Sequence, residues 1–211
     1  VLIVICILCL GCSKSIVEDN KKLEEKNIDN LISDEDIKNS IFKDNYQAAR
    51  KVVDKMTIEE KVGQLFLVRY NSSDVANLVD YYPGGYILFA KDFENHTKTS
   101  IKNELDQAQK LNKYPLILGV DEEGGYVTRV SRFSSFRNEK FFAPKYYYSQ
   151  GGYELLEQVE NEKNQLIKSI GLNLNLAPVA DISYNENDFI YSRAFGQPAK
   201  ETAEFIKQAT G

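Results

Sequence analysis

The stretch that decides the fold is PLILGVDEEGGYVTR, residues 115–129. An uninterrupted apolar run over 115–120 leads directly into the carboxylates Asp121, Glu122 and Glu123, and two glycines follow. A short continuous apolar run is typical of a parallel strand that is buried on both faces. Glycines allow a tight turn and a close approach of the backbone to a ligand. The stretch therefore predicts a buried parallel strand with a polar turn at its carboxyl end.

Apolar runs on either side of this stretch predict three more strands, over residues 65–68, 85–89 and 172–179. The segments between the later strands carry apolar residues at helical spacing. These residues are Ile101, Leu105 and Ala108, followed by Leu155, Val159, Leu166 and Ile170. Another helical pattern begins at 201–210. Strands that alternate with helices predict the α/β class, with a parallel sheet and crossover helices.

Such a sheet closes either as a doubly wound open sheet or as a barrel. No G-x-G-x-x-G pattern follows the first predicted strand, which argues against a dinucleotide site. Asp121 and Asp181 follow the third and fourth predicted strands, and in barrels function gathers at these strand ends. The pattern favours a (β/α)8 TIM-type barrel. A complete barrel takes about 250 residues, so residues 37–211 are expected to form only its N-terminal half.

The first twelve residues read as an address. Residues 1–11 are almost wholly apolar, which suits the h-region of a secretory signal. The run ends in LCLGC, which resembles a bacterial lipobox and predicts lipidation of Cys12, although a plain signal peptide is the alternative. Residues 13–36 are rich in Lys, Glu, Asp and Asn and predict a polar linker. We expect a lipid-anchored protein of the cell envelope, on the outer side of the cytoplasmic membrane, or alternatively a secreted one.

Helical patterns continue after this linker. Ile41, Ala48, Val52 and Met56 stand at helical spacing and are expected to pack in a core. The tetrad Thr57-Ile58-Glu59-Glu60 is a capping-box pattern, which predicts that another helix starts there.

The composition is that of an ordinary globular protein. The 211 residues are 43% hydrophobic and 27% charged, with a formal net charge of -5. No basic stripe stands out, so we expect no nucleic-acid partner. The three cysteines all lie within the first twelve residues, and His96 is the single histidine. This distribution argues against a zinc site of the Cys/His type, and neither a metal nor a cofactor is expected.

Five motifs carry a resemblance when they are taken in order. They are MTIEEKVGQL at 56–65, GGYILF at 84–89, GVDEEGGYVTR at 119–129, NLNLAPVAD at 173–181 and YSRAFG at 191–196. Together they resemble glycoside hydrolase family 3, and especially its bacterial β-N-acetylglucosaminidase branch. The resemblance covers about residue 56 to the end. It implies retaining hydrolysis of terminal non-reducing β-linked N-acetylhexosamine from cell-wall or other amino-sugar glycans.

The resemblance also implies roles for individual residues. Asp121 would bind hydroxyls of the terminal sugar in the -1 subsite, and Arg129 and Arg193 would be further contacts with an oligosaccharide substrate. Tyr126 stands where the family often has arginine, and its role is open. Asp181 is expected to be an ion-pair partner or a loop cap.

The family's remaining chemistry is not found in these residues. The resemblance implies an aspartate nucleophile late in the barrel and a histidine acid/base in a Lys-His-x-Pro-Gly type of motif, and no such motif occurs here. The 211 residues alone are therefore expected to be inactive. The alternatives are a β-glucosidase or β-xylosidase of the same family, and a non-catalytic surface glycan-binding lipoprotein.

Other residues suggest chemistry but are given a structural interpretation. Glu122 and Glu123 could form a hard-metal site or an acid/base pair, but adjacent side chains point apart. His96 lies among polar residues and is expected in an exposed loop. The tyrosines at 146–148 could stack on sugar, but packing within a long loop is the favoured interpretation.

Overall fold

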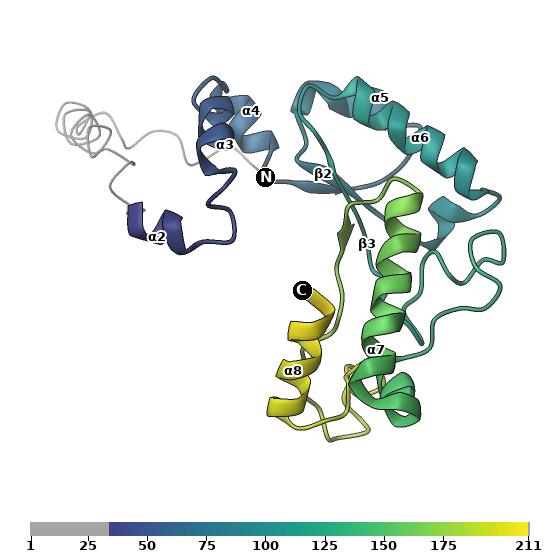
Figure 1. The fold of residues 1–211 in the computed structure, drawn as a ribbon. Coiled ribbons are helices and arrows are strands. Elements are labelled where there is room, and N and C mark those ends of the chain that lie inside the picture. The colour runs from purple at the N-terminus through teal and green to yellow at the C-terminus, as the bar shows by residue number, and fades with distance from the viewer. Residues whose placement is uncertain (1–33, 211) are drawn as a thin grey trace, which may run out of the picture. The chain divides into compact units, whose positions relative to one another are not determined.

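The computed structural model describes residues 34–210 (Figure 1). The chain divides into two compact units, one up to Met56 and one from Thr57 onward. The predicted signal peptide, Cys12 and nearly all of the predicted linker lie outside the described residues. Within residues 34–210, no helix combines the length and the hydropathy that crossing a membrane requires.

The described part of the first unit is helical but does not match the prediction. It contains two short helices, α2 (Asp34–Asn39) and α3 (Tyr46–Val53), so helix already begins inside the predicted linker. Ile41 falls in the turn between them and is 89% exposed, and Val52 is 46% exposed. The expectation that these residues pack in a core is wrong. Amphipathic spacing favours a helix, but it does not supply a surface for the apolar side to pack against.

The second unit opens with helix α4 (Ile58–Gly63), as its capping box predicts. The Thr57 hydroxyl accepts from the Glu60 backbone N–H at 3.3 Å, and the Glu60 carboxylate accepts from the Thr57 N–H at 2.9 Å. Two backbone donors that the first turn leaves free are satisfied in this way. The buried Glu60 carboxylate also forms an ion pair with Lys113.

All four predicted strands are present in one parallel sheet, in the order β1-β2-β3-β4. Their bounds are β1 (Leu67–Arg69), β2 (Gly85–Leu88), β3 (Ile117–Val120) and β4 (Leu174–Asn175). The fourth strand is two residues long, much shorter than the run of 172–179 predicts. This arrangement confirms the α/β class and the parallel sheet.

Helices connect the strands and follow the last one. Their bounds are α5 (Val75–Leu78), the 3-10 helices η2 (Val79–Tyr81) and η3 (Ala90–Phe93), α6 (Lys98–Leu111), α7 (Pro144–Ser169) and α8 (Ala199–Thr210). Helix α7 is kinked at Gly151 and Gly152, where the backbone leaves the helical conformation. Figure 1 shows α8 beside α7, and Phe195 and Phe205 pack with Leu156 between them.

The core lies on one face of the sheet. Tyr86, Leu88, Leu118 and Val120 of the central strands are fully buried there. They share a cluster with the apolar positions predicted on the helices, among them Ile101, Leu105, Leu166 and Ile170. On the strands' other side, Ile117 is 45% exposed and Leu67 is 43% exposed. The expectation of a sheet covered on both faces therefore holds for one face among the described residues.

Candidate functional site

A pocket of about 490 Å³ lies at the carboxyl ends of β3 and β4. Its lining brings together the three residues that the sequence predicts as a site. The lining residues are Asp121, Glu123, Tyr126, Val127, Arg129, Leu176, Phe189, Ser192 and Arg193. Its size is within the range of small-molecule sites, which run from about 300 to 1,000 Å³.

Glu122 organises the loop that follows β3. Its side chain is fully buried, and its carboxylate accepts hydrogen bonds from the backbone N–H groups of Arg129 at 2.8 Å and Val130 at 2.7 Å. The N–H and hydroxyl of Ser131 donate to the same carboxylate. A buried charge is stable only when such donors surround it. Glu122 thus connects the start of the loop to residues 129–131 and fixes the position of the Arg129 backbone.

Two glycines make the first turn of this loop. Gly124 has a φ of +98° and Gly125 a φ of +69°, a region that glycine adopts without a steric cost. A side chain at Gly124 would also bring its Cβ within 2.2 Å of the Phe142 carbonyl oxygen. The turn exposes Tyr126 at its tip, where 82% of the residue is accessible to solvent.

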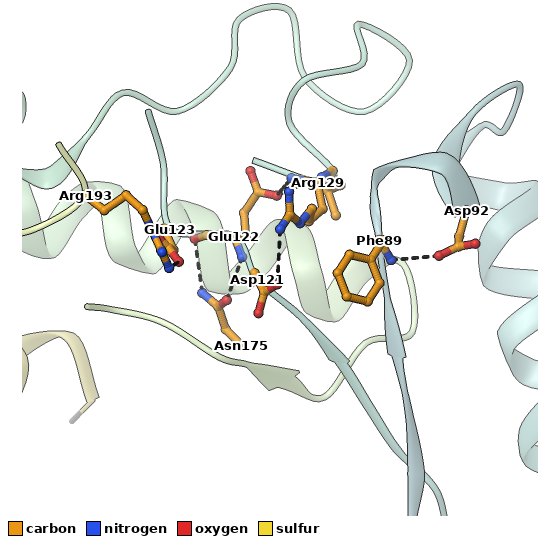
Figure 2. Close-up of polar contacts among 9 residues, drawn as sticks. Phe89, Asp92, Asp121, Glu122, Glu123, Arg129, Asn175 and Arg193 are labelled. Carbon is orange, nitrogen blue, oxygen red and sulfur yellow. Dashed lines mark hydrogen bonds and ion pairs between the residues drawn. The ribbon is translucent and has the colours of Figure 1, made fainter. Parts of the chain in front are cut away.

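Asp121 and Arg129 form a loose ion pair in the pocket. The Arg129 Nη2 lies 3.3 Å from the Asp121 Oδ2, and the two side chains are 23% and 22% exposed. The Arg129 guanidinium carbon lies 5.4 Å from the ring centroid of Phe89, and Figure 2 shows that ring next to the pair. The Arg129 Nε is buried and has no hydrogen-bond partner within residues 34–210.

Phe89 is itself held from two sides. Its backbone N–H donates to Asp92 at 2.7 Å (Figure 2), and the guanidinium carbon of Arg69 lies 4.8 Å from its ring centroid. Arg69 also donates to Asp92 at 2.8 Å. The ring of Phe89 therefore lies near two guanidinium groups, Arg69 from β1 and Arg129 from the loop after β3.

Glu123 and Arg193 form a much tighter pair. Arg193 donates from Nε at 2.9 Å and from Nη2 at 2.5 Å to the two carboxylate oxygens of Glu123, whose side chain is 7% exposed. The pKa of Arg193 is raised above its ordinary value, chiefly because Glu123 accepts these hydrogen bonds. The fully buried Lys163 donates to the Glu123 carbonyl at 3.3 Å and to Glu160 at 2.6 Å. The Arg193 Nη1 takes no part in this bidentate pair.

Strand β4 is fastened to the same loop by Asn175. Its side-chain oxygen accepts from the Glu122 N–H at 3.0 Å, and its amide nitrogen donates to the Glu122 carbonyl at 3.4 Å. Figure 2 shows Glu123 directed toward Arg193 and away from the Glu122 carboxylate, as expected for adjacent side chains. Within residues 34–210, no cluster of His, Cys, Asp and Glu could hold a metal ion.

The other residues considered from the sequence lie outside the pocket lining. His96 is in a loop, with Nδ1 3.2 Å from the Ser100 hydroxyl, and its side chain is 26% exposed. The tyrosines at 146–148 lie in the first turns of α7 and not in a loop, because Pro144 starts the helix there. They pack with other aromatic rings, including Phe142 and Phe195. Asp181 is exposed and makes no ion-pair contact within 4 Å among residues 34–210, but its charge, after those of Glu123 and Asp121, helps to raise the pKa of Arg193.

Sequence reasoning missed two functional features of this site. It gave Glu122 no role and gave Arg193 no protein partner. Glu123 and Arg193 are 70 positions apart, so no local pattern pointed to their pairing. The signal for Glu122 was weak, because the backbone N–H groups that it binds lie seven to nine positions later, at Arg129, Val130 and Ser131, and only the general need of loop N–H groups for acceptors pointed to them.

Comparisons with known proteins identify the family to which this fold belongs. The family model described as "Glycosyl hydrolase family 3 N terminal domain" matches residues 57–210. The β-hexosaminidase A of Pseudoalteromonas piscicida is 30% identical over 131 residues, which are 59% of this chain and 22% of that protein. The β-hexosaminidase of Vibrio cholerae serotype O1 is 32% identical over 130 residues, which are 59% of this chain and 37% of that protein.

Solved structures show the same fold. A family 3 β-N-acetylglucosaminidase from Paenibacillus sp. str. FPU-7 has a TM-score of 0.64 at 24% identity, over 73% of this chain and 30% of that one. The M tuberculosis protein LpqI has a TM-score of 0.63 at 19% identity, over 75% of this chain and 45% of that one. The chain thus spans about a fifth to two fifths of the curated relatives' length. Because the family model covers most of the chain, this protein belongs to glycosyl hydrolase family 3 and carries the family's N-terminal domain over residues 57–210.

Proposed function

We propose that this chain supplies the sugar-binding part of a retaining exo-β-N-acetylhexosaminidase. The enzyme would release terminal non-reducing β-linked N-acetylhexosamine from cell-wall or other amino-sugar glycans. The observation that carries the proposal is one pocket lined by Asp121, Arg129 and Arg193. The names of the relatives, which include several β-hexosaminidases, support this substrate class.

The chemistry of the pocket suits a sugar. A carboxylate accepts hydrogen bonds from hydroxyl groups, and a guanidinium donates them in a fixed fork. Asp121 and Arg129 share a single 3.3 Å contact, so both keep hydrogen-bonding capacity for a ligand. Arg193 uses Nε and Nη2 for Glu123, and its Nη1 can donate to a sugar.

The two carboxylates of the pocket are poor candidates for the catalytic pair. Glu123 accepts two hydrogen bonds from Arg193, and Asp121 lies 3.3 Å from Arg129, so both carboxylates already serve as acceptors for an arginine. We propose that the nucleophile and the acid/base lie beyond Gly211, and that β1 to β4 are the first half of a (β/α)8 barrel. The small share of the relatives' length that this chain spans supports both proposals.

Turnover of three glycosides tests the hydrolase proposal. The full-length protein should hydrolyse a 4-nitrophenyl N-acetyl-β-D-glucosaminide in preference to the matching β-glucoside and β-xyloside, and the 211-residue chain should hydrolyse none of them. A preference for the glucoside or xyloside would favour the other branches of the family. Binding without turnover by the full-length protein would favour a glycan-binding lipoprotein. Turnover by the 211-residue chain would place the catalytic residues within it.

We also propose that Cys12 is lipidated and anchors the protein on the outer side of the cytoplasmic membrane. The apolar run that ends in LCLGC supports this proposal. Metabolic labelling with a fatty-acid probe should mark the wild-type protein and a Cys9→Ala variant, but not Cys12→Ala. If the label persists in Cys12→Ala, or if wild-type protein is released unlabelled into the medium, the anchor proposal is wrong.

A further inference from the structure

Tyr126 is an exposed aromatic residue on a well-fixed turn. It lines the pocket although 82% of the residue is accessible to solvent. The N–H groups of Glu123 and Gly124 both donate to the Val127 carbonyl at 3.0 Å, and the Gly125 N–H donates to the Phe141 carbonyl at 2.8 Å. Backbone hydrogen bonds therefore fix the residues before and after Tyr126, while the Tyr126 ring itself is exposed to solvent.

Phe189 is a second exposed aromatic ring in the lining of the same pocket. It is 85% exposed, the highest value among the exposed aromatic residues of the described chain. The guanidinium carbon of Arg193 lies 5.4 Å from its ring centroid, and Arg193 is fixed in turn by Glu123. One face of the Phe189 ring thus has a positioned neighbour, and its high exposure leaves the other face accessible.

The pocket therefore combines mostly buried charged groups with aromatic rings that are exposed to solvent. Asp121 and Arg129 are each about three quarters buried or more, whereas Tyr126 and Phe189 are almost wholly exposed. A pyranose ring has the matching division, with hydroxyl groups around its edge and C–H groups on its faces. Polar side chains fix the hydroxyls, and aromatic rings provide flat apolar area for the faces.

We infer that Tyr126 and Phe189 form a binding site for the sugar on the leaving-group side of the scissile bond. This inference rests on the proposed function, in which only the terminal sugar enters the charged part of the pocket. The next sugar of the glycan must then lie outward from it, where the two aromatic rings are. Tyr126 and Phe189 are accordingly specificity-determining residues that favour an oligosaccharide over a glycoside with a small leaving group.

Two substrates that share the terminal sugar separate this role from a general one. The full-length protein is assayed with N,N′-diacetylchitobiose, which has a leaving sugar, and with methyl N-acetyl-β-D-glucosaminide, which has none. Tyr126→Ala and Phe189→Ala should each lower kcat/KM for the disaccharide about 2- to 12-fold, the effect of losing one stacking contact. The same variants should leave kcat/KM for the methyl glycoside within about twofold of wild type.

Matched variants control for the ring and for exposure. Tyr126→Phe and Phe189→Tyr keep an aromatic ring and should behave as wild type on both substrates. Tyr81→Ala removes another exposed tyrosine, 71% exposed on η2 and outside the pocket lining, and should change neither value. Equal losses on both substrates in the alanine variants would overturn the inference, and so would an unchanged value for the disaccharide.

Binding measured without turnover separates this inference from the proposed function. If the full-length protein hydrolyses none of the glycosides, the proposed function fails. Saturation-transfer difference NMR with N,N′-diacetylchitobiose then tests the rings directly. Contact at the C–H protons of the reducing-end sugar in wild type, lost in Tyr126→Ala and Phe189→Ala, would support the site. Absence of that contact in wild type would overturn it.

Discussion

The pocket contains two carboxylate–arginine pairs that are held very differently. Asp121 and Arg129 are eight positions apart on one loop and share a single 3.3 Å contact. Glu123 and Arg193 come from segments 70 positions apart and share two hydrogen bonds, of 2.9 and 2.5 Å. The Glu123 side chain is 7% exposed, against 22% for Asp121.

This difference indicates that the tight pair stabilises the fold, whereas the loose pair is available to a ligand. A buried carboxylate in a bidentate pair has used most of its hydrogen-bonding capacity on protein. Glu123 and Arg193 therefore connect the loop after β3 with the segment after β4. A loose and partly exposed pair keeps lone pairs and N–H groups for another molecule, so Asp121 and Arg129 are the better candidates for direct sugar recognition.

Removal of the Glu123 charge should have the largest effect, and the effect should be on stability. Glu123→Gln leaves the Arg193 guanidinium without its counter-charge, so the free energy of unfolding of the full-length protein should fall by about 2–4 kcal/mol, less than for a fully buried pair because 24% of the Arg193 side chain is exposed. Asp121→Asn makes the same chemical change two positions earlier and should cost less than about 1 kcal/mol, because its pair is loose and partly solvated. Urea unfolding measures both. Equal losses would mean that the two pairs do not differ as their geometries indicate.

Asp121→Asn should instead affect activity. Charge-assisted hydrogen bonds are worth about 1.5–3 kcal/mol each, so kcat/KM should fall on the order of ten- to several-hundred-fold. The stereochemical outcome and the shape of the pH profile should stay as in wild type, because the proposed role is binding and not proton transfer. Loss of one limb of the pH profile would show that Asp121 is an acid or a base. An unchanged kcat/KM would show that its carboxylate serves only the loop.

The smallest effect is expected from the support beneath the loose pair. Phe89→Leu removes the ring that lies 5.4 Å from the Arg129 guanidinium carbon, and a cation–π contact is worth about 0.5–1 kcal/mol at an exposed site. We expect kcat/KM to fall about 2- to 5-fold while the pH profile is unchanged. Phe89→Tyr keeps the ring and should restore the wild-type value. If the tyrosine variant is as slow as the leucine variant, Phe89 does not act through its ring.

The sequence predicted the parts of this molecule that are governed by local patterns. The four strands, the apolar positions Ile101, Leu105 and Ala108 of α6, and the Thr57–Glu60 capping box are all confirmed. Asp121, Arg129 and Arg193 also line one pocket, because the carboxyl ends of parallel strands share one edge of the sheet.

Features that depend on distant partners were not predicted. The carboxylate that pairs with Arg193 is decided by the path of the chain after β4, and this path brings Arg193 to Glu123 rather than to Asp121. Ile41 and Val52 have helical spacing, but spacing does not show that a surface exists to cover them, and both are exposed. The two-residue length of β4 could not be predicted from the leucine-rich segment 172–179, since backbone pairing and not hydrophobicity ends the strand.

The growing intervals between paired strands have a consequence for how the protein folds. The sequence separation between paired residues grows from the pair Leu67 and Gly85 to the pair Gly119 and Leu174. Closing the longest of these loops costs about 1 kcal/mol more in chain entropy than closing the shortest. The longest loop also precedes the weakest pairing, because β3 and β4 share two residue pairs whereas β2 and β3 share four. We therefore expect β4 to join last during folding and to detach first under stress. Because Asn175 of β4 holds the Glu122 backbone, the pocket would be the last part of this sheet to assemble and the first to open.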